Sequence, residues 1–222
     1  MSTSLDFFRM LTAIARRMDG YHRWQHFDTI ASLPPREQET VLEHTFHTVF
    51  LTLFLLDLEE RHGTHASEIN RELLLLTALL HDLGEGMIGD VAYRVKQDER
   101  VKEGLRAIEQ EMVEDILMSV PEFLRDKLRM AYRVVDSDTM EGRFFNAVER
   151  LGYILYARDR VERGDDSFIQ VYIRQNDKIL ELAQLFESVR VVYEEHKDHI
   201  ARKIRLYKEG KRLGDMTGAH RT

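Results

Sequence analysis

Apolar and polar residues follow a helical period along almost the whole chain. Apolar positions recur at intervals of three and four, which predicts amphipathic helices, and no alternating period-2 segment bounded by turn residues stands out. The expected helices span residues 5–18, 40–61, 67–82, 99–118, 122–136, 141–163, 168–187 and 188–209. We therefore expect an all-α fold.

Local signals support several of these boundaries. Thr40-Val41-Leu42-Glu43 matches a capping box and should begin the second helix. Ser67 or a neighbour should begin the third helix, which ends near His81-Asp82, and the glycines within 84–89 indicate a turn after it. Residues 19–39 contain Pro34-Pro35 and are expected to form mostly a connection.

No segment divides the chain into two domains. It has three prolines, no internal repeat and no linker rich in small or turn-forming residues. The simplest prediction is one helical-bundle domain over residues 1–209, followed by a polar, frayed tail over 210–222. The long helices beyond Ser167 would be available for a homodimer interface.

Composition narrows the class of protein. The 222 residues are 43% hydrophobic and 32% charged, as in an ordinary globular domain, with a formal charge of −7 that argues against a general nucleic-acid binder. The chain has no cysteine, so a metal would need His, Asp or Glu ligands. Its longest apolar runs are too short to span a bilayer, and the N-terminus lacks signal-peptide features, so a cytoplasmic location is expected.

The run from His81 to Asp90 carries the densest candidate chemistry. His81 and Asp82 follow the apolar stretch Leu73–Leu80, and Glu85 and Asp90 come soon after. Carboxylates at the C-terminal end of a helix dipole are unfavourable unless a cation compensates them. Because neutral imidazole and ionised carboxylate bind divalent metals together, this run predicts part of a metal site.

His44 is the candidate partner from an earlier helix. The face that carries His44 also carries Thr48, Leu51 and Leu55, so it should point inward. A histidine there can equally be a hydrogen-bonded core residue. His47 lies one turn further and is expected to pack or cap rather than to bind metal.

The order of these residues resembles the HD-domain metal-dependent phosphohydrolases, in which a histidine precedes His-Asp and a later acidic ligand. Within that group the chain is similar to the YfbR-like 5′-deoxynucleotidases over roughly residues 5–190. The resemblance rests on these matches: Arg23-Trp24, Glu43-His44-Thr45, His81-Asp82, Glu85, Gly89-Asp90 and Lys96. It implies a helical HD-domain bundle, one divalent metal ion (Mn, Co, Mg, Zn, Fe or Ni), a nucleotide substrate and a homodimer. The formal charge and the short apolar runs predict no nucleic-acid and no membrane partner.

The chain departs from this family pattern in two places. The segment between Trp24 and His44 is longer than usual, and the family's last ligand, an aspartate, reads here as Glu149. The resemblance then implies His44, His81, Asp82 and Glu149 as metal ligands. The alternative is that Glu149 lies at the surface in an ion pair with Arg150 or another nearby arginine. In that case the fallback ligands are Asp136, Asp138 and Asp159.

The other residues that match the family pattern are candidates for catalysis and substrate binding around this metal centre. Glu85 is the candidate to orient or deprotonate the attacking water, and Asp90 to protonate the leaving group or bind the sugar. Arg23 would bind phosphate through its planar fork, and Lys96 would add positive charge. Trp24 offers a flat face to the sugar or base, and the resemblance implies that it crowds out a ribose 2′-hydroxyl.

The leading hypothesis is therefore a phosphomonoesterase that hydrolyses deoxyribonucleoside 5′-monophosphates. Two alternatives stay open: the same site acting on another nucleotide or small phosphoester, and a regulatory protein with a degenerate site.

Overall fold

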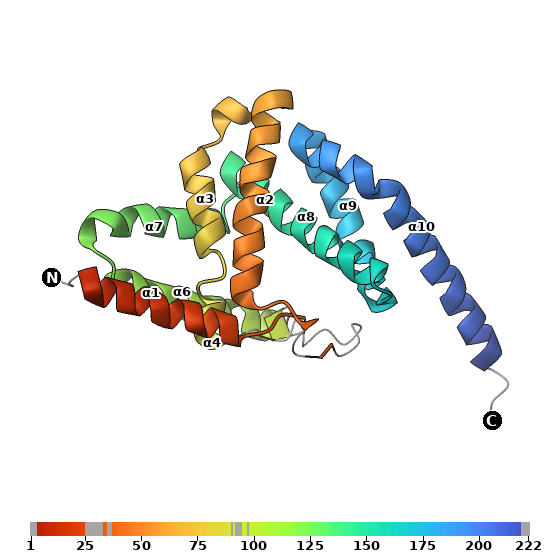
Figure 1. Ribbon diagram of the computed structural model, residues 1–222, viewed down its shortest axis with the longest axis horizontal. Coiled ribbons are helices and arrows are strands. Elements are labelled where there is room, and N and C mark those ends of the chain that lie inside the picture. Colours follow the sequence, from red (N-terminus) through yellow and green to blue (C-terminus); the bar gives the residue numbers. More distant parts are fainter. Residues whose placement is uncertain are drawn as a thin grey trace.

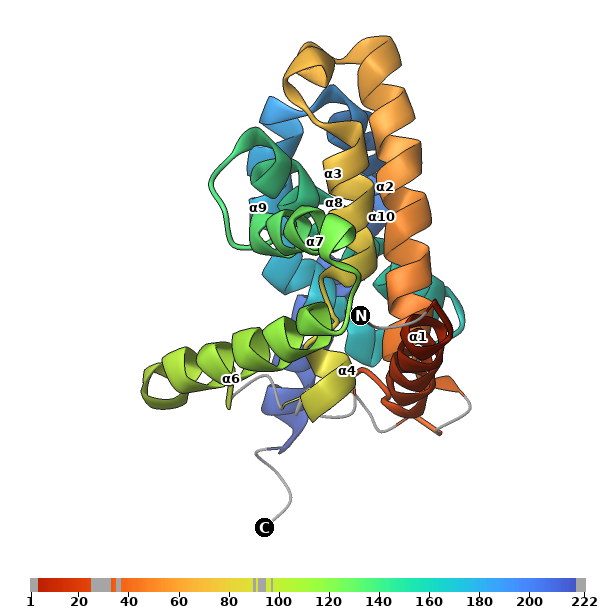
Figure 2. The ribbon, with the colours of Figure 1, turned by 90° about the vertical axis from the view of Figure 1, so that its left-hand side faces the viewer.

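The computed structural model describes residues 4–24, 33–34, 37–89, 91, 95–96 and 98–218, with side chains to residue 210. In this part of the chain the regular elements are helices (Figure 1 and Figure 2). They are α1 (Ser4–Gly20), α2 (Val41–His62), η2 (Ala66–Glu68), α3 (Arg71–Leu80), α4 (Glu85–Ile88), α6 (Glu99–Met118), α7 (Glu122–Val134), α8 (Met140–Glu162), η3 (Asp166–Phe168), α9 (Ile169–Leu185) and α10 (Glu187–Gly218). The all-α fold class is confirmed.

Two apolar clusters make up the core. The larger surrounds α8, whose apolar side chains point to several sides and which contacts α2, α3, α7, α9 and α10. The smaller joins α1, α6 and α7 to the N-terminal end of α2 and the C-terminal end of α3. Figure 2 shows α6 projecting away from the upright pair α2 and α3. The start of α2 and the end of α3 therefore meet where the two clusters join.

The predicted capping box at the start of α2 is present. The Thr40 hydroxyl accepts a hydrogen bond from the Glu43 amide, and the Glu43 carboxylate accepts one from the Thr40 amide. An isolated antiparallel bridge pairs His22 with Thr40. It carries residues 21–24, which follow α1, against the first turn of α2.

The third helix begins later than the sequence indicated. Ser67 lies in the short 3₁₀-helix η2, and α3 starts at Arg71. Asn70 is the actual cap, because its side chain accepts a hydrogen bond from the Leu73 amide. Its own amide donates to the Glu141 carboxylate of α8. The contact between Asn70 and Glu141, which are far apart in sequence, therefore favours Asn70 over Ser67 as the cap of α3.

The glycines after His81 do not all form a turn. The turn covers residues 81–84, and Glu85–Ile88 then forms the short helix α4. A Cβ on Gly86 would lie 2.6 Å from Met18 Cγ, so glycine is needed for α1 and α4 to approach closely. Gly89, with φ of 86°, ends α4 in the left-handed region that glycine adopts without strain.

The C-terminal helix is longer than expected. α10 continues past residue 209 to Gly218, so the segment expected to fray begins as helix. The division at residue 209 and the homodimer stay predictions.

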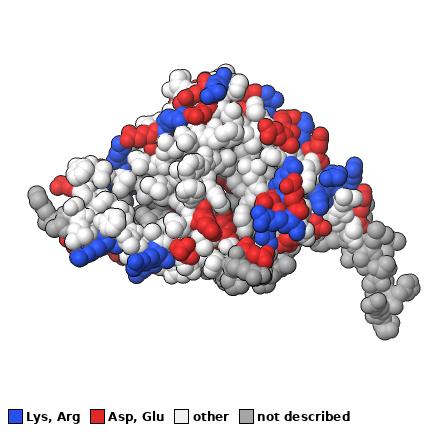
Figure 3. Space-filling view, in the orientation of Figure 1, with Lys and Arg blue, Asp and Glu red and all other residues white. Residues whose placement is uncertain are grey.

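The outward face of α2 is unusually apolar. Phe46, Phe50 and Phe54 lie four residues apart and are 61%, 56% and 53% exposed. Figure 3 shows a broad area without charged side chains over this helix. By length and composition alone α2 would be able to cross a bilayer, but 39% of that stretch is buried in the protein. A central core helix has the same features, so this carries no membrane assignment.

Replacing Gly63 by alanine should destabilise the fold. A Cβ there would lie 1.8 Å from Oε1 of Glu59, whose other oxygen accepts hydrogen bonds from the amide and hydroxyl of Ser188 at 2.9 and 2.7 Å. Displacing this buried carboxylate from the start of α10 should cost about 1–3 kcal/mol in urea unfolding. Gly104→Ala is the control, because open space surrounds Gly104 within α6 and alanine should stabilise that helix by ~0.5–1 kcal/mol. Equal stabilities of the two variants would contradict the conclusion that residue 63 must be glycine to leave room for the Glu59 carboxylate.

Candidate active site

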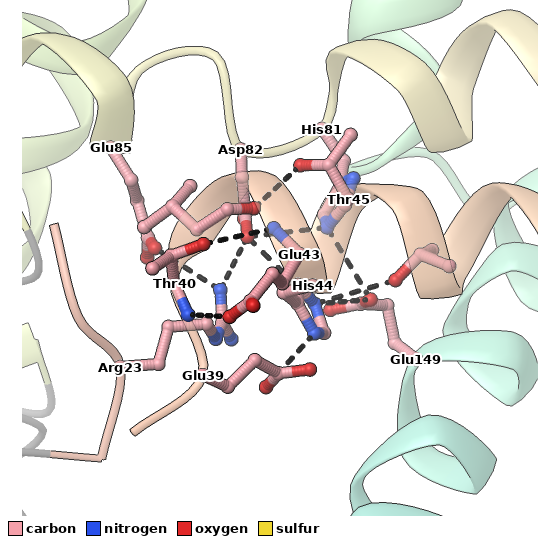
Figure 4. Close-up of polar contacts among 12 residues, drawn as sticks. Arg23, Glu39, Thr40, Glu43, His44, Thr45, His81, Asp82, Glu85 and Glu149 are labelled. Atoms are coloured by element: carbon pink, nitrogen blue, oxygen red, sulfur yellow. Dashed lines mark hydrogen bonds and ion pairs between the residues drawn. The ribbon is translucent and has the colours of Figure 1, made fainter. Parts of the chain in front are cut away.

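Three predicted ligands converge between α2, the end of α3, and α8. One ligand atom from each of His44, His81 and Glu149 lies within 4.8 Å of the other two. His44 Nε2 is 3.2 Å from Glu149 Oε1, and His81 Nε2 is 3.5 Å from the same oxygen. Figure 4 shows these side chains pointing toward one another from three separate helical segments. Residues far apart in sequence therefore form one polar cluster.

Asp82, the fourth predicted ligand, lies beside both histidines. Its Oδ2 is 3.3 Å from His81 Nε2 and 3.8 Å from His44 Nε2. The cluster thus contains two imidazoles and two carboxylates, a donor set that suits a divalent transition metal or Mg²⁺.

The orientation of His81 fits a metal ligand. Its Nδ1 lies 2.8 Å from the Ala78 carbonyl oxygen and is the donor of that hydrogen bond. Its Nε2 is buried and makes no well-aligned hydrogen bond to the described residues, although Asp82 Oδ2 lies 3.3 Å away. A buried nitrogen with a free lone pair, aimed at two carboxylates, is costly unless a cation or a proton satisfies it.

Glu149 turns inward rather than toward Arg150. Its Oε2 accepts a hydrogen bond from the Tyr153 hydroxyl at 2.8 Å, which leaves Oε1 facing the two histidines. Arg150 instead donates to Asn146 and Gln175. The fallback aspartates pair with other arginines: Asp136 with Arg106, Asp138 with Arg143 and Asp159 with Arg163.

Arg23 connects the cluster to Glu85. Its guanidinium donates to Asp82 and, at 3.2 Å, to Glu85 Oε2. Lys96 pairs with the other oxygen of Glu85. The matched Arg23, Asp82, Glu85 and Lys96 therefore form one continuous ion-pair network at the edge of the metal cluster. Asp90 lies outside the described residues.

A cavity of ≈ 260 Å³ opens beside this network. Among its lining residues are His81, Asp82, Glu85 and Lys96, together with Glu109 and Tyr132 from α6 and α7. Burial raises the pKa of the half-buried Glu109 carboxyl. The cavity therefore combines the predicted ligands with cationic and acidic groups from later helices.

Trp24 is buried beside the cluster instead of offering an open face. It stacks on Tyr156 with ring centroids 5.3 Å apart and meets Tyr153 edge-on. Among the described residues other than glycine it alone has a positive φ, 70°. Such a conformation is costly for a bulky side chain and persists where the surroundings hold it.

The electrostatics of the cluster favour a bound cation. Burial opposes the charged form of His44, but Glu149 and Glu39 outweigh it and raise its pKa to about 9. Burial also opposes the Glu149 carboxylate, yet His81 and His44 lower its pKa to about 2. Asp82, although buried, has its pKa held well below the usual range by His81 and Arg23. Ionised carboxylates enclosed in this way are strong ligands for a divalent ion.

Comparison with known proteins identifies the family. A family model described as 5′-deoxynucleotidase YfbR-like matches residues 7–199. The chain belongs to the YfbR-like 5′-deoxynucleotidase family. Among curated proteins, a relative of this YfbR-like chain is the 4′-phosphooxetanocin A phosphatase of Priestia megaterium, 26% identical over 157 residues, which are 69% of this chain and 77% of the relative.

Solved structures share the fold of this YfbR-like protein. An HD-domain phosphohydrolase from Listeria innocua has a TM-score of 0.70 at 18% identity, with 96% of this chain and 99% of that one covered. A predicted metal-dependent phosphohydrolase from Magnetospirillum magnetotacticum has a TM-score of 0.61 at 14% identity, with 91% and 97% covered. The solved structures show that the YfbR-like chain has the HD-domain bundle fold. Its family and its curated relative make it a phosphohydrolase, and the alternative of a non-catalytic protein is set aside.

Three neighbours of the site were missed by sequence reasoning. Tyr153 lies four residues after Glu149 on α8, so the helical period was an available signal for it. Glu39 precedes the α2 cap directly, and its contact with His44 depends on side-chain direction. Glu109 comes from α6, and no spacing in the chain connects it to the ligand residues.

Proposed function

We propose that this YfbR-like enzyme hydrolyses deoxyribonucleoside 5′-monophosphates to the nucleoside and phosphate. The observation that carries the proposal is the close approach of His44, His81, Asp82 and Glu149 next to Arg23 and Trp24. In this proposal His44, His81, Asp82 and Glu149 would hold one divalent ion, which would supply Lewis-acid chemistry to the phosphate and to a water beside it.

The chain's own residues supply the remaining chemistry. Glu85 lies one helical turn beyond Asp82 and accepts the proton of the attacking water. Arg23 is paired with Asp82 and Glu85 in the structure, and it would turn its planar fork toward the phosphate when substrate binds. Lys96 balances the negative charge that develops there, and Asp90 protonates the departing 5′-oxygen or binds the sugar.

Sugar selection is assigned to Trp24. The indole is held by Tyr156 and Tyr153, so it yields little to a larger substrate. Only 7% of Trp24 is exposed, so the indole would meet the sugar through that small exposed edge. A rigid edge there would discriminate against an additional 2′-hydroxyl by no more than roughly 100-fold, the limit for a packing contact alone.

A second candidate substrate is a small phosphoester with a different sugar-like ring. It is favoured by the relative from Priestia megaterium, which is named as a phosphatase of 4′-phosphooxetanocin A. The same metal centre would serve either substrate, and the difference would lie in the part of the cavity that receives the ring.

A substrate panel tests the proposal. The protein is stripped of metal and reloaded separately with Mn²⁺, Co²⁺ or Mg²⁺. It is then assayed for phosphate release from matched deoxy- and ribonucleoside 5′-monophosphates and from small phosphoesters that are not nucleotides. We expect metal-dependent release with the deoxy forms faster by ~10–100-fold. Equal rates on the two sets would contradict the role of Trp24, whereas release from other phosphoesters alone would contradict the nucleotidase assignment.

A further inference from the structure

Glu39 is a buried carboxylate that contacts both halves of the site. It immediately precedes the α2 cap, and its side chain is only 4% exposed. Its backbone carbonyl accepts a hydrogen bond from the Arg23 amide at 2.8 Å. The backbone pairing that brings residues 21–24 to α2 therefore also holds Glu39 next to Trp24.

The two carboxylate oxygens of Glu39 lie close to three side-chain nitrogens. Oε2 accepts from the Trp24 indole nitrogen at 3.2 Å and lies 3.6 Å from His44 Nδ1. Oε1 lies 3.1 Å from Nδ1 of His47, whose side chain is largely exposed. Figure 4 shows Glu39 on the side of His44 that is opposite Asp82 and His81.

This placement distinguishes the two nitrogens of His44. Nδ1 faces Glu39, whereas Nε2 faces Glu149. A carboxylate beside one ring nitrogen favours a proton there, which leaves the lone pair of the other nitrogen for a metal. The same carboxylate oxygen accepts the hydrogen bond of the Trp24 indole, so the two side chains lie beside a single charged oxygen.

We propose that Glu39 is a positioning residue that couples the metal ligand His44 to Trp24. It holds His44 in the form that binds metal through Nε2, and occupation of the metal site adjusts the carboxylate that orients the indole. The inference rests on the proposed role of His44 as a ligand and goes beyond it, because it connects the metal centre with the residue assigned to sugar selection.

A matched control variant, Glu43→Gln, distinguishes the proposed positioning role of Glu39 from a purely structural role at the start of α2. Glu43 is a second glutamate in the same turn, but it is exposed and its carboxylate accepts from the Thr40 amide. Glutamine is also a natural residue at that capping-box position. Glu43→Gln therefore changes the same charge near the same helix start without touching His44 or Trp24.

The first measurement is Zn²⁺ affinity by competition with a chelator. We expect Glu39→Gln to weaken binding ~10–100-fold relative to both wild type and Glu43→Gln, as is typical when an outer-shell partner of a metal ligand is removed. Circular dichroism verifies that both variants are folded. An affinity for Glu39→Gln equal to that of Glu43→Gln would overturn the inference.

The second measurement uses Trp24 as a reporter, since it is the only tryptophan in the chain. In wild type and Glu43→Gln, saturation with Zn²⁺ should change the indole emission. In Glu39→Gln at saturating Zn²⁺ the change should be at least halved. An unchanged response in Glu39→Gln would overturn the coupling between the two side chains.

A third measurement needs no variant. Nitrogen-15 NMR of the Zn²⁺-loaded wild type should show His44 bound through Nε2 with Nδ1 protonated, and binding through Nδ1 would overturn the inference. Failure of wild type to bind Zn²⁺ at all would overturn the metal centre itself. Normal Zn²⁺ binding with no effect of Glu39→Gln would overturn the role of Glu39 alone.

Discussion

Replacing Glu149 by glutamine is expected to abolish tight metal binding and, with it, phosphatase activity. Glutamine keeps the length of the side chain and an acceptor for the Tyr153 hydroxyl, but it removes the charge 3.2 Å from His44 Nε2 and 3.5 Å from His81 Nε2. We expect the loss of metal affinity to exceed the ~10–100-fold typical of an outer-shell change. Chelator competition and phosphate release measure both effects.

Asp159→Asn provides the control for this prediction. Asp159 also lies on α8 and was a fallback ligand, but it pairs with the exposed Arg163 at 2.8 Å. Metal affinity and activity should be unchanged in that variant. If Glu149→Gln retained the metal and Asp136→Asn lost it, the ligand role would move to Asp136, which lines the adjacent cavity.

The helices were predictable where their ends carry local signals. The expected span 99–118 coincides with α6, whose cap, Asp98, accepts a hydrogen bond from the Arg100 amide. The capping box at Thr40 was equally readable. The start of α3 was not, since Ser67 and Asn70 are both good caps, and the bond from the Asn70 amide to Glu141 comes from a helix far along the chain.

The metal-ligand residues could be predicted in part from the sequence, because histidine and aspartate next to each other at a helix end are typical of a metal site. His-Asp at a helix end and an inward His44 indicated two parts of the cluster that the structure brings together, and the family resemblance supplied Glu149. Sequence order did not indicate that Arg23 lies between Asp82 and Glu85. That position follows from the bridge between His22 and Thr40, a pairing that no local pattern encodes.

The buried position of Arg23 leads to a large, metal-dependent effect on stability. Its side chain is 12% exposed, and its ion-pair partners Asp82 and Glu85 are 12% and 13% exposed. Arg23→Met removes the positive charge and keeps much of the apolar stem. In metal-free protein the enclosed Asp82 then loses its arginine partner, and Glu85 keeps only Lys96 among its described partners. Breaking a buried pair in this way typically costs about 3–5 kcal/mol.

Metal should reverse much of that loss, because a divalent ion near Asp82 supplies the missing positive charge. We expect the thermal midpoint of Arg23→Met to fall far below that of wild type in chelator, and the difference to shrink when Mn²⁺ or Mg²⁺ is added. Arg71→Met is the matched control. Arg71 also pairs with two carboxylates, Asp57 and Glu60, but its side chain is 37% exposed, so its removal should cost ~0–1 kcal/mol with or without metal. If Arg23→Met lost equal stability in both conditions, Arg23 and the metal would not neutralise the same carboxylates. Arg23 would then stabilise the fold only through its packing and its pair with Glu85.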